Sequence, residues 1–241
     1  MKAIGALIVV CLGLLCAASV SAFTAPERLE YNVQWLGIYA GTAVMSLEKS
    51  GANYLIKTEA KSADYVSLFY RVEDSAWSVV DGSQGVFGYP LNYHLKTREG
   101  RHRKDKEVVF DRKSKKALYT NHIDGKKEEF SVAGDMHDPL SGFFAVRNLV
   151  MNVGSTVKVR IFDSKKTWDV EVEVLRKEKV TVPAGTFDTV VVKPKLQSEG
   201  IFSRKGDMYI WLTDDEKKIP VVLKTKVAIG SVTAELTAGQ F

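Results

Sequence analysis

The sequence predicts a mainly β protein, with a single strongly curved antiparallel sheet or partly open barrel of about ten to twelve strands and one buried helix at about residues 138–151. Three observations predict this fold class. Apolar and polar residues alternate in runs along the chain, turn residues separate these runs, and one segment has helical spacing instead. Because no linker, repeat or low-complexity segment divides the runs, residues 23–241 are expected to form a single β-rich domain.

Residues 1–22 have the features of a secretory signal peptide. Lys2 precedes an apolar run at 3–16, and the small residues at 20–22 suit cleavage before Phe23. The run is shorter than the roughly 20 residues that a membrane span requires, which argues against an uncleaved anchor. We therefore expect export to the periplasm of a Gram-negative bacterium, with no transmembrane segment left after cleavage.

Both cysteines of the chain, Cys11 and Cys16, lie inside the predicted signal peptide. A mature chain without them has no disulfide, no thiolate nucleophile and no cysteine metal ligand. Its stability must then come from a large hydrophobic core, for which about 219 residues, 241 minus 22, are sufficient.

The strand pattern begins close to the predicted cleavage site. Its apolar positions share one face of each strand, with polar residues between them, as in an antiparallel sheet that has one solvated side. The clearest sets are Leu29, Tyr31, Val33 and Trp35; Tyr54, Ile56, Thr58 and Ala60; Trp168, Val170, Val172 and Val174; and Met208, Ile210 and Leu212. Turn residues at 37–41, 50–51, 81–82, 124–125, 183–185 and 214–217 separate successive runs, so the strands are expected to be linked as hairpins.

The segment at 138–151 is the helical exception. Asp138 is a good N-cap, Pro139 suits the first helical position, and residues 152–154 provide a stop. The apolar residues Leu140, Phe143, Phe144, Val146, Leu149, Val150 and Met151 cover most of the circumference, while Ser141, Arg147 and Asn148 form a narrow polar edge. A helix that is apolar nearly all round is buried.

A curved sheet of ten or more strands encloses more room than its inward side chains fill, and the helix would occupy part of it. The remaining space is the predicted ligand site. Its candidate contact residues are aromatic: Trp35, Tyr54, Phe69, Tyr70, Trp77, Tyr93, Phe143 and Phe144. The alternative is that these residues form a packed core with no cavity.

The sequence contains little that indicates catalysis. Its histidines are His94, His102, His122 and His137, and neither a G-x-S-x-G elbow nor an S-x-x-K motif is present. His137, Asp138 and Ser141 are the residue types of a catalytic relay, yet neighbours at a helix start are poorly placed to form one, and a helix cap explains them equally well.

Metal ligation also lacks a complete pattern, because Asp135, His137 and Asp138 in one loop have no second histidine cluster to complete a shell. We therefore predict no catalytic residue, no metal ligand and no cofactor.

A basic segment remains. Residues 97–116 hold nine Lys or Arg and four Asp or Glu, which accounts for a local charge of +5. We interpret this segment as a cationic hairpin that contacts an anionic head group or a partner through Arg98, Arg101, Arg103, Lys104 and Lys106. Export argues against nucleic acid and leaves anionic lipids, lipopolysaccharide phosphates or acidic glycans. The alternative is a solvated edge that resists aggregation between sheets.

Four stretches carry a family resemblance. They are ERLEYNVQWLGIYAGTAVMSL at 27–47, HDPLSGFFAVRNL at 137–149, VTVPAGTFDTVVVKP at 180–194 and IWLTDDEKKIPVVLKTKVAIGSVTAEL at 210–236. In order and spacing they resemble the exported bacterial family catalogued as domain of unknown function 3108. The resemblance implies export and a β-rich domain and assigns no activity. A curved sheet holding a helix is also similar in architecture to the periplasmic lipoprotein carriers LolA and LolB.

The leading functional hypothesis is a non-enzymatic periplasmic protein that binds an apolar or amphipathic small molecule, such as a lipid or acyl chain, between sheet and helix. The first alternative is an envelope interaction or assembly factor that docks a protein or an anionic surface through its sheet face or cationic hairpin. The second is a hydrolase or glycan-active enzyme, which would depend on His137 and Asp138.

Overall fold

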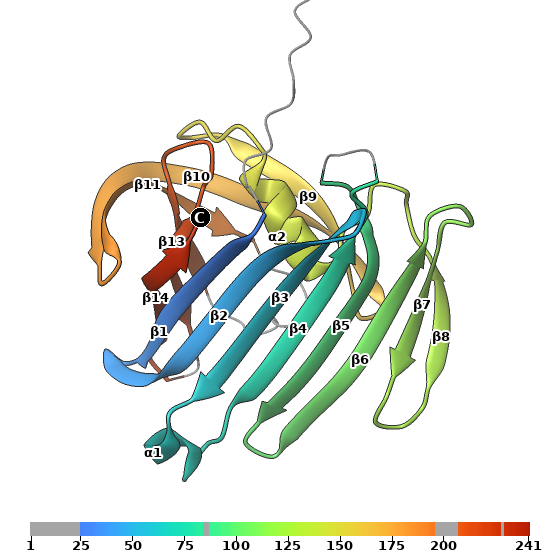
Figure 1. Ribbon diagram of the computed structural model, residues 1–241, viewed down its shortest axis with the longest axis horizontal. Coiled ribbons are helices and arrows are strands. Elements are labelled where there is room, and N and C mark those ends of the chain that lie inside the picture. Colours follow the sequence, from blue (N-terminus) through green and yellow to red (C-terminus); the bar gives the residue numbers. More distant parts are fainter. Residues whose placement is uncertain (1–24, 84–86, 196–206, 228) are drawn as a thin grey trace, which may run out of the picture.

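The computed structural model describes residues 25–83, 87–195, 207–227 and 229–241, so the predicted signal peptide at 1–22 lies outside the described residues. All strands belong to one antiparallel sheet in the order β8-β7-β6-β5-β4-β3-β2-β1-β14-β13-β12-β11-β10-β9 (Figure 1). The elements are β1 (Glu27–Trp35), β2 (Ile38–Ser50), β3 (Asn53–Ser62), α1 (Asp64–Ser67), β4 (Glu73–Val80), β5 (Pro90–Glu99), β6 (His102–Asp111), β7 (Lys116–Asn121), β8 (Lys127–Ser131), α2 (Pro139–Arg147), β9 (Thr156–Asp163), β10 (Lys166–Val182), β11 (Gly185–Pro194), β12 (Met208–Thr213), β13 (Pro220–Lys226) and β14 (Ser231–Gln240).

The predicted fold class is confirmed: the protein is mainly β, with one antiparallel sheet that is not closed into a barrel. The predicted number of ten to twelve strands is wrong, because the described residues form 14 strands, and α1 is a second, short helix. Strand β8 illustrates why the count fell short. Its sequence KEEFS has five residues, three of them charged, so apolar alternation is too weak to identify it.

The two edges of the sheet, β8 and β9, lie near each other and are joined by side chains. Lys106 of β6 places Nζ 3.1 Å from Oδ1 of Asp163 at the end of β9, and both residues are buried. Phe130 of β8 packs against Phe162 of β9 with ring centroids 5.6 Å apart. We call this junction the seam. It brings the sheet almost into a cylinder although β8 and β9 form no ladder with each other.

Helix α2 lies inside the curve of the sheet (Figure 1). Asp138 caps it by accepting hydrogen bonds at Oδ1 from the backbone N–H groups of Leu140, at 2.7 Å, and Ser141, at 3.0 Å. The helix ends at Arg147, which is earlier than the predicted end near residue 151, and Val150 is 76% exposed. The predicted burial of the helix is confirmed, since most of its residues, including Phe144, are buried.

The close approach of α2 to β9 depends on a glycine. A Cβ atom added to Gly142 would come 3.0 Å from Cδ1 of Ile161, so a larger residue would push the helix away from the strand. Two polar contacts fix the helix from other sides. Ser78 of β4 donates to Oδ2 of Asp138 at 2.6 Å, and Arg147 forms a buried ion pair with Glu27 of β1.

The hydrophobic core lies on the inner face of the sheet, around α2. One cluster joins the helix to β2–β7, a second joins it to β9–β12, and a third lies among β1, β13 and β14. Within the described part of the chain, no helix is both long enough and apolar enough to cross a membrane.

Candidate functional site

A cleft of about 280 Å³ lies inside the curved sheet, beside α2. Strands from both halves of the sheet contribute to its wall. Most of its lining is apolar and includes Tyr31, Ala43, Met45, Ala60, Ala76, Leu95, Leu140, Phe143, Ile210, Leu223 and Ala234. Several of these residues are alanines, so the side chains on this part of the inner face occupy little volume. The cleft exists because small side chains stand opposite the helix where larger ones would fill the space.

A second cavity, of about 60 Å³, lies between α2 and β9–β12. Pro139, Phe143 and Ile210 line both spaces. Phe143 is half-buried and packs its ring edge-to-face on Phe144, with centroids 6.0 Å apart. The side chain of Phe143 therefore lies between the two cavities.

The lining of the cleft becomes polar at its mouth. Asp74, Thr97, Glu99 and Lys104 contribute to it there, from β4, β5 and β6. An apolar wall with a few charged groups at one end suits a molecule that has an apolar body and a polar head.

The predicted aromatic contacts separate into two groups. Tyr54, Tyr93 and Phe144 belong to the packed core on the inner face, and Phe143 lines the cleft. The hydroxyl of Tyr93 is buried without a hydrogen-bond partner, and burial raises the pKa of this phenol well above its usual range.

The other four residues lie away from the cleft. Trp77 is on the outer face of β4, where its ring stacks on His94 of β5 with centroids 4.1 Å apart. Trp35 and Tyr70 are exposed at the end of β1 and in the α1–β4 connection, and Phe69 is 90% exposed. The structure thus does not bring these four residues together with α2.

The predicted cationic residues lie around the β5–β6 turn and along β6, while Lys113 and Lys115 lie in the turn at the other end of β6. Residues 97–116 thus span the β5–β6 turn, the whole of β6 and the β6–β7 turn, and Arg103, Lys104 and Lys106 lie on β6 between the two turns. Lys104 reaches the mouth of the cleft, and Arg98 pairs with Glu73 at 3.1 Å.

A polar cleft of about 430 Å³ lies along the seam. Arg103, Lys104 and Lys106 contribute to it from β6, and residues 163–166 contribute from the β9–β10 turn. Arg101 is exposed in the β5–β6 turn.

His137 and Asp138 are arranged as structural groups. Asp138 is fully buried, and its Oδ2 atom accepts hydrogen bonds from the hydroxyls of Ser78 and Ser141. Burial raises the pKa of Asp138. His137 packs against the ring of Tyr89 in a tilted arrangement with centroids 4.9 Å apart, and burial lowers the pKa of His137 to about 4. Because Ser141 donates to Asp138 and the Nδ1 atom of His137 has no hydrogen-bond partner, Asp138 and Ser141 form a helix cap, and the three residues do not form a relay.

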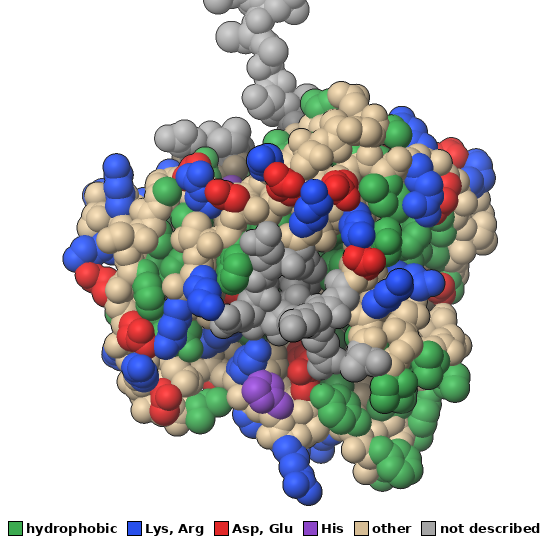
Figure 2. All heavy atoms as spheres, turned by 180° about the vertical axis from the view of Figure 1, so that it is seen from behind, with side chains coloured by type: hydrophobic (Ala, Val, Ile, Leu, Met, Phe, Trp, Pro, Cys, Tyr) green, Lys and Arg blue, Asp and Glu red, His purple; other side chains and the backbone are tan. Residues whose placement is uncertain are grey.

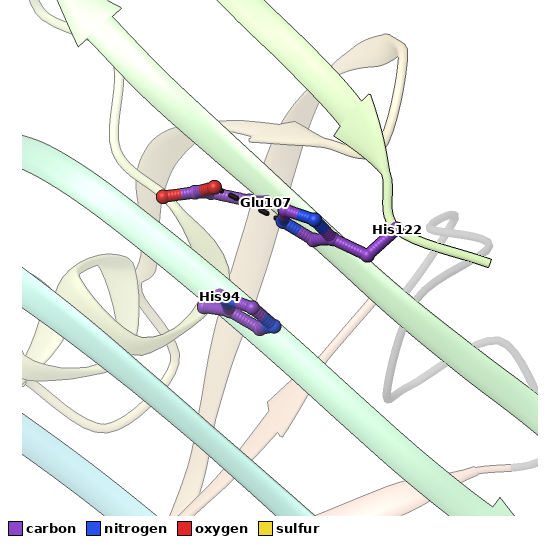
Figure 3. Close-up of side chains that lie close together, drawn as sticks. All are labelled: His94, Glu107 and His122. Carbon is purple, nitrogen blue, oxygen red and sulfur yellow. Dashed lines mark hydrogen bonds and ion pairs between the residues drawn. The ribbon is translucent and has the colours of Figure 1, made fainter. Parts of the chain in front are cut away.

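A cluster on the outer face was not recognised from the sequence. His94 of β5, Glu107 of β6 and His122, just after β7, place one ligand atom each within 4.8 Å of one another. Figure 3 shows the two imidazole rings lying parallel, and Nε2 of His122 is 3.0 Å from Oε2 of Glu107. These residues could hold a divalent cation. The signal for the cluster was the register of a hairpin centred on the turn at 100–101, which pairs His94 with Glu107.

The comparisons with known proteins agree with the fold. A sequence profile of the family described as "Protein of unknown function (DUF3108)" matches residues 30–237. A crystal structure of a beta-barrel-like protein of domain of unknown function DUF1849 from Brucella abortus superposes with a TM-score of 0.57 at 10% identity, covering 89% of this chain and 97% of that one.

Two further solved structures are less similar. A candidate lipoprotein from Parabacteroides distasonis has a TM-score of 0.35 at 13% identity, with 90% of this chain and 96% of that chain covered. A candidate exported protein with a YmcC-like fold from Bacteroides fragilis has a TM-score of 0.34 at 13% identity, with 90% and 97% covered. No curated protein matches the chain.

Proposed function

The chain belongs to the DUF3108 family of proteins of unknown function, and we propose that it is an exported, non-enzymatic protein that binds an amphipathic molecule, such as a lipid or another acyl-chain compound, in the cleft beside α2. The periplasm is the proposed compartment, as the features of residues 1–22 indicate. The observation that carries the proposal is the apolar cleft with charged groups at its mouth.

The size of the cleft supports a small ligand. An engineered apolar cavity of about 150 Å³ is known to remain dry and to bind benzene. The cleft beside α2, at about 280 Å³, is larger and open at one end. Its wall offers methyl groups and the ring of Phe143, so burial of an acyl chain would be driven by removal of apolar surface from water.

The charges at the mouth suggest how the head of the ligand is oriented. Lys104 lines both the mouth of the apolar cleft and the polar cleft along the seam. Its ammonium group is thus placed where a carboxylate or phosphate head would leave the apolar wall. Asp74 and Glu99 lie at the same mouth and would disfavour an anion close to β4 and β5.

A fluorescent fatty-acid probe tests the proposal. The substitution Ala60→Phe places a ring in the cleft from the inner face of β3, whereas Lys57→Phe places the same ring on the exposed outer face of the same strand. We expect A60F to lose probe binding and K57F to retain it. Native mass spectrometry of the protein purified from its own cells should show a bound small molecule in the wild type.

Two results would contradict ligand binding in the cleft. One is wild-type protein that is consistently free of ligand and also fails to bind the probe. The other is equal probe binding by A60F and K57F. Circular dichroism of both variants shows whether each is folded, so that loss of binding is not confused with loss of structure.

A further inference from the structure

Large apolar side chains are exposed at one end of the molecule. The antiparallel order places the β1–β2, β5–β6 and β13–β14 turns and the α1 connection between β3 and β4 at the same end. Exposed there are Trp35, Leu36, Ile38, Tyr39, Tyr65, Leu68, Phe69, Tyr70 and Ile229. We call these nine residues the apolar rim.

Hydrogen bonds and a ring contact hold the connections that carry the rim side by side. Nε1 of Trp35 donates to the backbone oxygen of Ile229 at 2.9 Å, which joins the β1–β2 and β13–β14 turns. The backbone N–H of Ala63 donates to Ala40 at 2.8 Å, which joins α1 to β2. The Tyr70 ring packs against the backbone at Gly100 in the β5–β6 turn. The rim is therefore a continuous surface built from four neighbouring connections.

Figure 2, which views the molecule from behind, shows hydrophobic side chains (green) gathered at its lower right. This is the end at which α1 and the β1–β2 turn lie, at the lower left of Figure 1. Leu68 is 81% exposed and Phe69 is 90% exposed, values that are costly for single side chains in water. Grouped apolar exposure of this kind marks an interaction surface.

The composition of the rim and its neighbours points to a lipid surface. Trp and Tyr rings have an apolar body and a polar tip and are enriched at membrane interfaces. The adjacent β5–β6 turn is basic, with five Lys or Arg against two Asp or Glu over residues 97–106. Arg101 and Arg103 are exposed there, which suits phosphate groups of anionic lipids.

We propose that the apolar rim docks on an anionic phospholipid bilayer, with Leu68 and Phe69 entering the interface and Arg101 and Arg103 contacting phosphates. The mouth of the cleft opens next to this surface. Ala60, Ser75 and Glu99 line the cleft within a few residues of α1 and of the β5–β6 turn. Docking would thus bring the mouth of the cleft to the membrane. This proposal does not require that the cleft hold a ligand.

Co-sedimentation with vesicles tests the docking. Vesicles of phosphatidylethanolamine and phosphatidylglycerol are compared with vesicles of phosphatidylcholine alone. We expect wild-type protein to bind the anionic vesicles, L68S/F69S to bind them about tenfold more weakly or worse, and R101E/R103E to lose about tenfold. The control is V150S/V153S, which removes exposed apolar side chains from the α2–β9 loop, at the other end of the molecule in Figure 1.

Equal vesicle binding by L68S/F69S and V150S/V153S would overturn the proposal, as would wild-type protein that ignores both kinds of vesicle. Light scattering after size-exclusion chromatography separates a further outcome. A wild-type dimer that L68S/F69S converts to monomer, without vesicle binding, would identify the rim as a self-association surface instead. A60F distinguishes the two proposals, because it should lose the fatty-acid probe and keep vesicle binding.

A different observation carries a second proposal. On the outer face, the Nε2 atom of His122 and the Oε2 atom of Glu107 are 3.0 Å apart, close to the separation of about 3.3 Å expected for two ligands on a tetrahedral zinc ion. The His94 ring is parallel to that of His122, with centroids 5.2 Å apart. The Nε2 atom of His94 forms a hydrogen bond with Oδ1 of Asp105 at 2.7 Å.

Neighbouring groups orient this cluster. Nδ2 of Asn92 donates to Oε1 of Glu107 at 2.7 Å, while Oε2 of Glu107 lies 3.0 Å from Nε2 of His122. The Asp105 contact to one nitrogen of His94 resembles the carboxylate contacts that orient metal-binding histidines. We infer that His94, Glu107 and His122 form a site for a divalent transition-metal ion such as Zn²⁺ or Cu²⁺, since imidazole and carboxylate ligands suit these ions.

Trp77 reports on this site because its ring stacks on His94. We expect Cu²⁺ to quench part of the tryptophan fluorescence saturably and Zn²⁺ to compete. The variants H94Q and H122Q should weaken both effects at least about tenfold. The control H102Q removes an exposed histidine at the β5–β6 turn. W77F should lose the optical signal and retain metal affinity in calorimetry.

Loss of metal affinity in H102Q equal to that in H94Q would contradict the site. Metal binding that is absent in the wild type, or unchanged in a folded H94Q/H122Q double variant, would show that the three side chains only form a hydrogen-bonded stack. Circular dichroism again establishes that the variants are folded.

Discussion

Arg147 and Glu27 form a two-pronged ion pair across the interior, with Nη1 donating to Oε1 at 2.8 Å and Nη2 donating to Oε2 at 2.7 Å. The pair is fully buried and joins the last turn of α2 to the start of β1. Nη2 of Arg147 also donates to the backbone oxygen of Lys217 at 2.9 Å. One arginine thus links the helix, the first strand and the β12–β13 connection.

Removal of one partner of this pair should be strongly destabilising. We expect Arg147→Met to lower the free energy of unfolding by about 3–5 kcal/mol, because it leaves the carboxylate of Glu27 buried alone. The double variant R147M/E27L should recover most of the loss. Urea unfolding measures both, with Arg28→Met as a control at an exposed arginine of the same strand. A loss in R147M no larger than that in R28M would refute this role.

The stability should depend on pH through His137. Its pKa is about 4 in the folded protein and near 6.5 in the unfolded chain, so the unfolded state binds the proton first. The contribution of neutral His137 is fully present above pH 6.5 and is lost as the pH falls toward 4, by at most about 3 kcal/mol. We expect His137→Phe to flatten the fall in unfolding free energy between pH 7 and 5, and His102→Gln to leave it unchanged. Parallel curves for wild type and H137F would refute the assignment.

The seam should open locally before the rest of the sheet unfolds. The Lys106 ammonium group contacts Asp163 and Ser164 across it. The substitution Lys106→Met removes that group and leaves the buried carboxylate of Asp163 without its ion-pair partner. We therefore expect faster hydrogen exchange in β8 and β9 than in the wild type, with little change in β1 and β2. Uniformly faster exchange in all four strands would indicate global destabilisation instead of local opening.

Phe143 should limit the size of the ligand. Because its ring lies between the two cavities, Phe143→Ala should join them, lower the unfolding free energy by about 2–3 kcal/mol and raise the affinity for longer acyl probes relative to short ones. Phe130→Ala provides a control at a half-buried ring near the seam. An unchanged preference for chain length in F143A would place the ligand elsewhere.

The sequence predicted the kind of fold because strand alternation and helix capping are local signals. The cap at Asp138 and the buried ring of Phe144 were both predicted from residues 138–151. An edge strand such as β8 is hard to count from the sequence, because an edge that is largely solvated has little apolar alternation. The helix end was misplaced because Leu149 and Val150 continue the apolar pattern after the chain has left the helix.

The site was harder to predict, because it depends on which face of each strand points inward. Trp77 is large and apolar, which favours an inward position, yet the structure places Ala76 and Ser78 inward. Those small residues make room for α2, and Ser78 contacts its cap. Packing between β4 and α2, which are far apart in the sequence, thus determines which face of β4 points inward. The local sequence of β4 does not contain this information.

The open seam also bears on self-association of this protein through the edges of its sheet. The backbone of His137 pairs with Arg160 and Phe162 on part of the β9 margin, whereas the free margin of a sheet presents main-chain donors and acceptors on which fibrils can grow. At one margin, Lys127, Glu128 and Glu129 follow in succession. A second molecule that added a strand there would have to remove water from charged side chains, so the residues that weaken the apolar pattern of β8 also disfavour polymerisation at this edge.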